Sequence, residues 1–299
     1  MKQYRTLVIG HITMDYDTDW IGKKTNIAGG AVLYSSASAY ALGHKVAALT
    51  KVAPQDKGRL SNFTIPKDDV YCIESEKSTT MSNVYFTADK ERRKSACTSK
   101  GAPFVLADIP ADIEAEIYHF AGLIYGDFGN DLIKALAARG KTALDVQACL
   151  RRLNEEDGSL YFADWEDKAE MLPYITFLKT DAAEAEIMTG QTDRYEAAKA
   201  LYAMGAKEVV ITHNSEVIAY DGTTMCSCPI RARNLSGRTG RGDTTFCAYI
   251  NERLDHDMET ALLYATATVS NKMEVPGPYR GTRADVERYI RSYYPEYAR

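Results

Sequence analysis

The chain has 299 residues, of which 45% are hydrophobic and 26% charged, as in soluble globular proteins with a large core. The formal net charge of −5 excludes a globally basic surface, so we expect no nucleic-acid partner. No apolar signal-peptide core follows Met1, and the longest uncharged stretch, 25–43, is broken by Gly, Ser and Asn. We therefore expect no membrane span. Six irregularly spaced cysteines favour reduced thiols and a cytoplasmic location.

Apolar runs typical of buried strands alternate with helical patterns along the chain. Residues 6–10 and 45–53 are predicted strands, and 29–43 between them is a helix rich in small residues. Further strands are predicted at 116–125, 141–146, 174–180, 207–212 and 216–220. Further helices are predicted at 130–140, 181–190 and 196–205 and from near Asp243, Met258 and Arg283. This alternation predicts an α/β fold with a doubly wound, mostly parallel sheet, in one domain spanning residues 1–299.

Two segments, 14–27 and 79–99, interrupt the alternation. The second has β-forming residues on both sides of a charged turn, which is typical of a hairpin. We expect the two segments to form a small antiparallel sheet that covers a cleft as a lid. Because an exposed sheet favours pairing, a homodimer through this lid is also expected.

The stretch LSGRTGRGDTTFCAYI, residues 235–250, places glycines and an aspartate directly before an apolar pattern. Its apolar residues recur at helical spacing, so a helix starts near Gly242. Amides at a helix start bind anions, and glycine lets a phosphate approach the backbone closely. Asp243 is then placed to take a proton from a hydroxyl beside that phosphate. A plain glycine turn with an acidic residue in the first helical turn explains the same residues.

The same stretch resembles the C-terminal signature D-T-x-G-A-G-D-x-F of the ribokinase/PfkB family of carbohydrate kinases. Four more segments resemble family motifs in family order: AGGAVLYSSASAYALG, KVAPQDKG, LKTDAAEAEIMTG and VVITHN. Together these segments span nearly the whole chain. The part GGAVLYSSA is similar to the inositol-kinase branch of the family.

The resemblance implies a ribokinase-like fold and a phosphoryl transfer from ATP. Asp243 would be the catalytic base, and the turn of Gly240, Arg241 and Gly242 would be the anion hole for the transferred group. Asp181 and Glu184 would organise Mg²⁺ near the phosphates. A capping box also explains this pair, and both interpretations can hold.

The resemblance also implies the remaining binding residues. The acceptor would be bound by Asp15, Gly29, Gly30 and Tyr34, and the nucleotide would lie near Thr212, Asn214 and Asn271.

Several positions depart from the family pattern. Arg241 stands where alanine is usual, and it either binds phosphate or points to solvent. Gly237 and Arg238 replace the usual Asp-Thr, and Tyr34 replaces an acceptor-binding asparagine.

The function predicted from these residues is an ATP- and Mg²⁺-dependent kinase. Its acceptor is a hydroxyl of a sugar, a nucleoside or a polyol such as inositol. One alternative is a non-catalytic ligand-binding or regulatory protein on the same fold, because the departures could mark lost chemistry. A dinucleotide-dependent oxidoreductase is disfavoured, because the chain has no N-terminal G-x-G-x-x-G.

Overall fold

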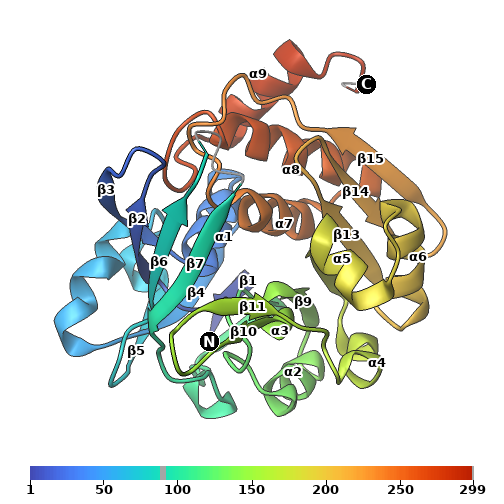
Figure 1. The fold of residues 1–299 in the computed structure, drawn as a ribbon. Coiled ribbons are helices and arrows are strands. Elements are labelled where there is room, and N and C mark those ends of the chain that lie inside the picture. Colours follow the sequence, from blue (N-terminus) through green and yellow to red (C-terminus); the bar gives the residue numbers. More distant parts are fainter. Residues whose placement is uncertain (88–91, 298–299) are drawn as a thin grey trace.

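The computed structural model describes residues 1–87 and 92–297. A nine-stranded sheet forms its centre, in the order β15-β14-β13-β12-β9-β8-β1-β4-β5 (Figure 1). All strands from β13 to β5 run parallel, whereas β14, near one edge, pairs antiparallel with both of its neighbours, β13 and β15. The strands are β1 (Lys2–Ile9), β4 (Val46–Val52), β5 (Val70–Glu74), β8 (Ile113–Phe120), β9 (Lys141–Asp145), β12 (Phe177–Asp181), β13 (Glu208–Thr212), β14 (Glu216–Tyr220) and β15 (Met225–Pro229).

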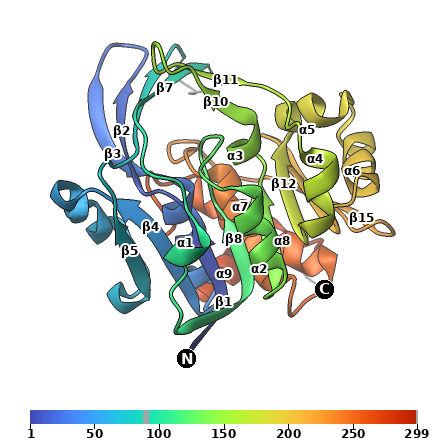
Figure 2. The same ribbon diagram turned by 90° about the horizontal axis from the view of Figure 1, so that it is seen from below.

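Helices cover both faces of this sheet, so the predicted doubly wound α/β fold is confirmed (Figures 1 and 2). One face carries α2 (Asn130–Ala137), α4 (Lys168–Met171), α5 (Ala182–Thr189) and α6 (Arg194–Ala203). The other carries α1 (Ala31–Ala41), α7 (Arg241–Glu252), α8 (Met258–Lys272) and α9 (Arg283–Tyr293). Short helices complete the elements: α3 (Gln147–Leu150) and 3₁₀ turns at Pro54–Asn62, Lys67–Asp69, Leu106–Asp108 and Leu172–Tyr174. Across the described ranges, no helix combines the length and apolarity that crossing a bilayer requires.

Four strands form a second sheet, which we call the lid, in the order β3-β2-β6-β7. They are β2 (Thr13–Thr18), β3 (Lys24–Gly29), β6 (Thr80–Tyr85) and β7 (Arg93–Ser99). Each predicted segment is an antiparallel pair, and a parallel β2–β6 pair joins the two. The tip of the predicted hairpin, 88–91, lies outside the described residues. Figure 2 shows the lid projecting beyond one end of the main sheet.

The strand predicted at 116–125 is shifted in the structure. Strand β8 starts earlier, at Ile113, and stops at Phe120. The next residues form a turn, because one oxygen of Asp127 accepts from the amides of Leu123 and Ile124, at 2.8 and 3.1 Å. The apolar residues after Phe120 are therefore buried by a turn rather than by a strand.

A hairpin of β10 (Arg151–Leu153) and β11 (Leu160–Phe162) was not predicted. Each of its strands has three residues, which is too short for a period-2 pattern to be recognised. Its tip reaches the lid, where the Cys97 amide of β7 donates to the Gly158 carbonyl at 2.8 Å. The hairpin therefore supports the lid at its β7 edge.

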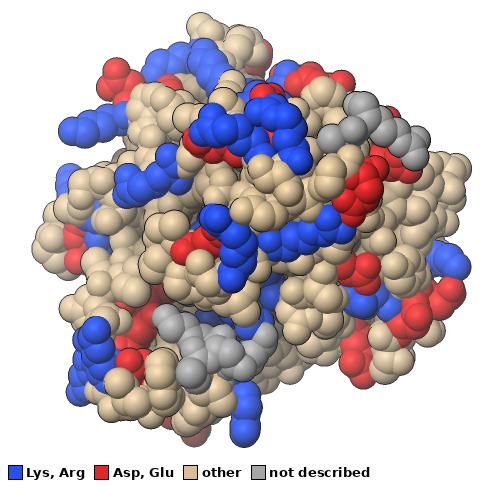
Figure 3. Space-filling model, turned by 90° about the horizontal axis from the view of Figure 1, so that it is seen from above, with Lys and Arg blue, Asp and Glu red and all other residues tan. Residues whose placement is uncertain are grey.

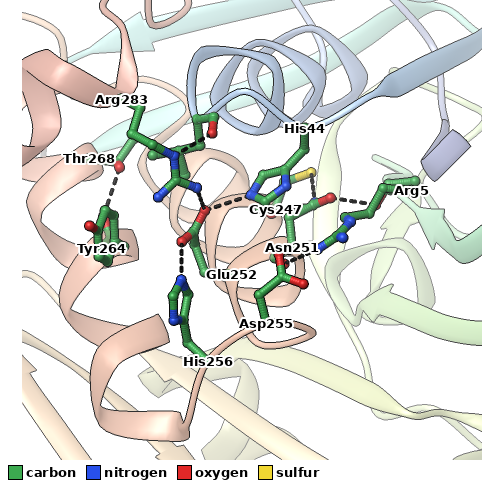
Figure 4. Close-up of polar contacts among 12 residues, drawn as sticks. Arg5, His44, Cys247, Asn251, Glu252, Asp255, His256, Tyr264, Thr268 and Arg283 are labelled. Atoms are coloured by element: carbon green, nitrogen blue, oxygen red, sulfur yellow. Dashed lines mark hydrogen bonds and ion pairs between the residues drawn. The ribbon is translucent and has the colours of Figure 1, made fainter.

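The C-terminal end of α7 is held by a buried ionic cluster (Figure 4). Glu252 is fully buried, and one of its carboxylate oxygens lies 2.5 Å from Nε2 of His44 and accepts from Arg283. Its other oxygen lies 3.5 Å from Nε2 of His256. Burial acts to raise the pKa of Glu252, but His44 and Arg283 outweigh burial and lower it. The charged carboxylate thus ties α7 to the residues after α1 and to the start of α9.

Candidate active site

A cavity of about 360 Å³ lies between the lid and the main sheet, at the carboxyl ends of the parallel strands. Asp145, Asp181 and Thr212 are the last residues of β9, β12 and β13, and all three line it. Open α/β sheets bind ligands at this edge. The cavity brings together most of the predicted residues: Asp15, Gly30, Tyr34, Asp181, Glu184, Thr212, Gly240, Arg241, Gly242 and Asp243.

Gly240 forms the turn that begins α7, in the left-handed conformation with φ 78° and ψ 17°. A Cβ atom there would lie 2.2 Å from Cδ1 of Tyr34, so the turn has room only for glycine. The Arg241 amide already donates within the turn. The amides of Gly242 and Asp243 are therefore the ones that the helix leaves to an external acceptor. We call residues 240–243 the anion turn.

The carboxyl group of Asp243 faces this cavity from the first turn of α7. Burial raises its pKa to about 6, and the charge of Asp145 acts in the same direction, while Lys179, Lys272 and Arg151 oppose both. A carboxylate that titrates near neutral pH is suited to accept a proton from a hydroxyl.

Lys179 is a buried cation in the cavity that sequence reasoning missed. Its Nζ lies 3.0 Å from Oδ2 of Asp145 and 3.6 Å from Oε2 of Glu184. Burial acts to lower the pKa of Lys179, but Asp145 and Glu184 outweigh burial, so the pKa is raised and the ammonium is charged. A Cβ atom on Gly242 would lie 3.2 Å from Cε and Nζ of this lysine, so the ammonium lies directly against the anion turn. The available signal was a lysine inside an apolar strand, two residues before Asp181.

Asp181 and Glu184 form the capping box that the sequence predicts at the start of α5. Oδ1 of Asp181 accepts from the Glu184 amide at 2.8 Å, and Oε2 of Glu184 accepts from the Asp181 amide at 2.7 Å. Burial raises the pKa of Glu184 to about 7, against the opposing charge of Lys179. Within residues 1–87 and 92–297, no three His, Cys, Asp or Glu side chains are grouped to hold a metal ion.

The opposite end of the cavity is formed by the lid and α1. Oδ1 of Asp15 accepts from the Thr13 hydroxyl at 2.6 Å, and burial raises the pKa of Asp15. Gly29 does not line the cavity, but a Cβ atom there would lie 2.5 Å from Oδ2 of Asp15. At Gly30 a Cβ atom would lie 2.2 Å from the His11 carbonyl oxygen. The Gly29–Gly30 pair therefore lets the start of α1 approach the Asp15 carboxylate.

Lid residues that sequence reasoning missed also line this end. Asn83 of β6 donates to Asp17 at 2.9 Å and accepts from the Ser95 hydroxyl at 2.6 Å, which fixes its amide. Arg93 of β7 and Arg151 of β10 line the same region. The alternation of the lid strands indicates which side chains face inward only once the register of the strands is known.

Two predicted nucleotide residues lie outside this cavity. Asn214 is exposed in the turn between β13 and β14. Asn271 lies near the end of α8, where its amide donates to the Tyr279 hydroxyl at 3.0 Å. Of this predicted group, only Thr212 faces the cavity.

Three arginines lie in the segment that leads into α7, and a fourth is the first residue of that helix. The first two, Arg231 and Arg233, form ion pairs with glutamates. The other two, Arg238 and Arg241, line the cavity. On the face seen from above the view of Figure 1, Lys and Arg side chains lie beside Asp and Glu side chains (Figure 3). The structure thus places Arg241 at the cavity, the alternative in which it can reach a phosphate.

The sequence pattern of the pfkB family of carbohydrate kinases matches residues 6–284. The chain belongs to this family. The family is one of carbohydrate kinases and the fold is ribokinase-like, so the oxidoreductase alternative falls away.

Among solved structures, the chain is similar to a pyrophosphate-dependent kinase in the ribokinase family complexed with a pyrophosphate analog and myo-inositol. The two are 33% identical with a TM-score of 0.85, covering 95% of this chain and 99% of that one. A pyrophosphate-dependent myo-inositol-1 kinase, converted into a myo-inositol-3 kinase by substitution, is 32% identical with a TM-score of 0.83, covering 97% and 99%. A cytidine kinase from Thermococcus kodakarensis is 24% identical over 243 residues, which are 79% of this chain and 84% of that protein.

Proposed function

We propose that the protein transfers a phosphoryl group from inorganic pyrophosphate to a hydroxyl group of an inositol-like polyol. The observation that carries this proposal is the start of α7. There a carboxylate with a pKa of about 6 lies next to two helix-start amides and a buried ammonium, Lys179. A phosphoryl transfer needs a group that orients the nucleophile and fixed positive charge at the transferred phosphoryl group.

Asp15 and the glycines beside it fit an acceptor with neighbouring hydroxyl groups. Each carboxylate oxygen accepts hydrogen bonds, so one side chain can bind two vicinal hydroxyls. The buried Tyr34 ring forms a flat wall beside the anion turn, and the amide of Asn83 is fixed on the lid side. A polyol ring fits between these groups. Of the two similar structures, one is a complex with myo-inositol and the other concerns a myo-inositol kinase.

The donor expected from the sequence is ATP, but the cavity favours a donor made of phosphate alone. Lys179, Arg238 and Arg241 place three positive charges where the donor phosphates would lie. Asn214 and Asn271, which the resemblance assigns to the nucleotide, do not line this cavity. The two similar kinases are described as pyrophosphate-dependent. Inorganic pyrophosphate therefore suits the arrangement better than ATP, which stays the competing donor.

Mg²⁺ fits beside the donor phosphates at Asp181 and Glu184. The capping box uses one oxygen of each carboxylate, so the second oxygen of each is left for a hydrated cation. The ion would neutralise phosphate charge. Lys179, bonded to Glu184 from the protein side, adds a fixed positive charge next to it.

In the proposed reaction, Asp243 removes the proton from the acceptor hydroxyl. At the same time, the hydroxyl oxygen attacks the nearer phosphorus atom of pyrophosphate. The bond from that phosphorus to the bridging oxygen breaks, and inorganic phosphate leaves with the bond's electron pair. The amides of Gly242 and Asp243 and the cations Lys179 and Arg241 stabilise the charge on the equatorial and leaving oxygens. The lid, segments 14–27 and 79–99 of one domain, excludes water that would compete with the acceptor. A cytoplasmic location and a homodimer through the lid belong to the same proposal.

The test is a donor-by-acceptor screen that measures the phosphorylated product directly. Pyrophosphate and ATP are each combined with Mg²⁺ and with inositols, pentoses or nucleosides. Product from pyrophosphate and an inositol supports the proposal, and product from ATP alone restores the donor expected from the sequence. Binding of a polyol without turnover of either donor would support the non-catalytic alternative instead.

A further inference from the structure

The segment that leads into the anion turn is docked on the residues that directly follow α8. The Ser236 hydroxyl donates to the Glu274 carbonyl at 2.8 Å, and the Gly237 amide donates to the Met273 carbonyl at 2.7 Å. A Cβ atom on Gly237 would lie 1.9 Å from the Val275 carbonyl oxygen, so the two backbones are in direct contact. The start of α7 therefore depends on the end of α8 for its position.

Lys272, the last residue of α8, joins these parts through one buried ammonium group. Its side chain is 1% exposed. Nζ donates to the Gly237 carbonyl at 2.5 Å and also to the Thr239 carbonyl. It lies 4.9 Å from the centroid of the Tyr34 ring, and that ring packs against Gly240. The ammonium thus contacts both the segment before the anion turn and the ring behind it.

Burying a lysine ammonium group at this position costs free energy. Burial lowers the pKa of Lys272 to about 7, against the opposing charge of Asp243. A leucine or methionine would fill the volume without that cost, but it could not bind two carbonyl oxygens that converge on one point. The carboxyl-terminal end of α8 also favours a cation, because the helix dipole is negative there.

We propose that Lys272 is a positioning residue, a tethered cation that holds the Gly237 and Thr239 carbonyls and thereby fixes the anion turn for phosphoryl transfer. The protein supplies this cation itself, so its activity does not depend on a dissociable monovalent cation. The inference deepens the proposed function and rests on it where turnover is concerned.

Lys272→Ala and Lys272→Met separate the charge from the volume. Alanine opens a space in which a small cation can bind the two carbonyls, whereas methionine fills that space without a charge. Lys51→Ala is the matched control. Lys51 is also buried, donates to a carbonyl (that of Pro103, at 3.0 Å) and lies over an aromatic ring, but does not line the cavity.

The kinetic experiment measures kcat and the acceptor KM in chlorides of K⁺, NH₄⁺ or tetramethylammonium at constant ionic strength. We expect wild-type kcat to be the same in all three salts. Both Lys272 variants should lose about 100-fold or more in kcat, the size of one lost oxyanion-hole donor, with little change in KM. K⁺ or NH₄⁺ should raise the kcat of Lys272→Ala by at least about tenfold. Tetramethylammonium should not, because it is too large for the space, and no cation should raise the kcat of Lys272→Met, because the methionine side chain occupies the site. Lys51→Ala should show no cation effect, however much stability it loses.

A measurement without turnover keeps the inference testable if the proposed reaction is wrong. Hydrogen exchange of residues 237–243 should be faster in Lys272→Ala and should slow again in NH₄⁺, but not in tetramethylammonium. If the wild-type protein is inactive in the donor screen but Lys272→Ala shows this exchange pattern, the proposed reaction is refuted and the positioning role of Lys272 is kept. A Lys272→Ala variant with wild-type kcat, or one whose exchange and activity no cation restores, would overturn the inference.

Discussion

Replacing Gly240 by alanine tests the anion turn most directly. The left-handed backbone at this position costs an alanine roughly 1–2 kcal/mol. The added Cβ atom would also lie 2.2 Å from Cδ1 and 2.3 Å from Cγ of the buried Tyr34 ring. Overpacking of this kind costs typically about 1–3 kcal/mol. We therefore expect Gly240→Ala to lower the free energy of unfolding by roughly 2–5 kcal/mol in total.

Gly190→Ala separates the backbone cost from the collision. Gly190 ends α5 with φ 72°, and no atom lies within 4 Å of the position of its Cβ. It should lose only the backbone part, roughly 1–2 kcal/mol. The assay is urea unfolding of both variants and of a double-mutant cycle with Tyr34→Ala, which should relieve only the Gly240 variant.

The kcat values of the same variants provide a second test. If the turn moves to relieve the ring, the Gly242 and Asp243 amides leave their positions, and loss of one such donor costs about 10²–10³ in kcat. Gly240→Ala should therefore lose turnover by at least this factor, and Gly190→Ala should keep wild-type kcat. Equal stability of the two alanine variants, together with full activity of Gly240→Ala, would refute the contact and its role together.

Three further outcomes follow from charged groups. Asp243→Asn should lower kcat by roughly 10²–10⁴ with little change in the acceptor KM, measured by initial rates at saturating donor. Wild-type kcat should rise as pH increases through about 6, because below that pH the Asp243 carboxyl group is protonated and cannot act as base; a flat profile through this region would contradict the assignment. Glu252→Gln should lower the free energy of unfolding by roughly 3 kcal/mol at neutral pH, because His44 and Arg283 lose their buried partner. Since the folded-state pKa of Glu252 is lowered, this stabilisation is present above its usual pKa of 4.5 and is lost as pH falls through the lowered value. Urea titrations of the two proteins should therefore converge in acid.

Seven strands of the main sheet, most helices and the lid could be predicted because each depends on periodicity within a short segment, whereas the edge strands β5 and β15 were not predicted. Helix α7 is an example, since its apolar spacing and preceding glycines are both local.

Lys179 could not be assigned in this way, because its role depends on which strands become neighbours. In the sheet, β9 pairs with β12 so that Lys179 lies opposite Asp145, although 34 residues separate them in the chain. On its other side, β12 pairs with β13, which places Asp181 opposite Thr212. Local patterns identify strands but do not give this register, and the cavity charges come from the register.

Lys272 was missed for a related reason. At the end of a predicted helix, a lysine is expected on the surface, where it interacts with the helix dipole. Only the docking of residues 236–239 on α8 buries it, and that contact has no period or motif in the sequence. Asn271, which the resemblance selected, lies one residue away and does not line the cavity.

Helix α7 is held at both ends by buried charged groups, one of which stabilises the fold while the other positions the anion turn. At its carboxyl end, the Glu252 cluster binds α7 to the segments beside α1 and α9, and any well-packed group could in principle do the same. At its amino end, the carbonyls of Gly237 and Thr239 converge on one amino group, and a side chain needs at least two N–H donors at that point to bind both. Loss of the Glu252 charge should therefore lower mainly the free energy of unfolding, whereas loss of the Lys272 charge should lower mainly kcat. The comparison of Glu252→Gln with Lys272→Met makes this distinction measurable, because the glutamine variant should unfold more easily yet keep its kcat while folded.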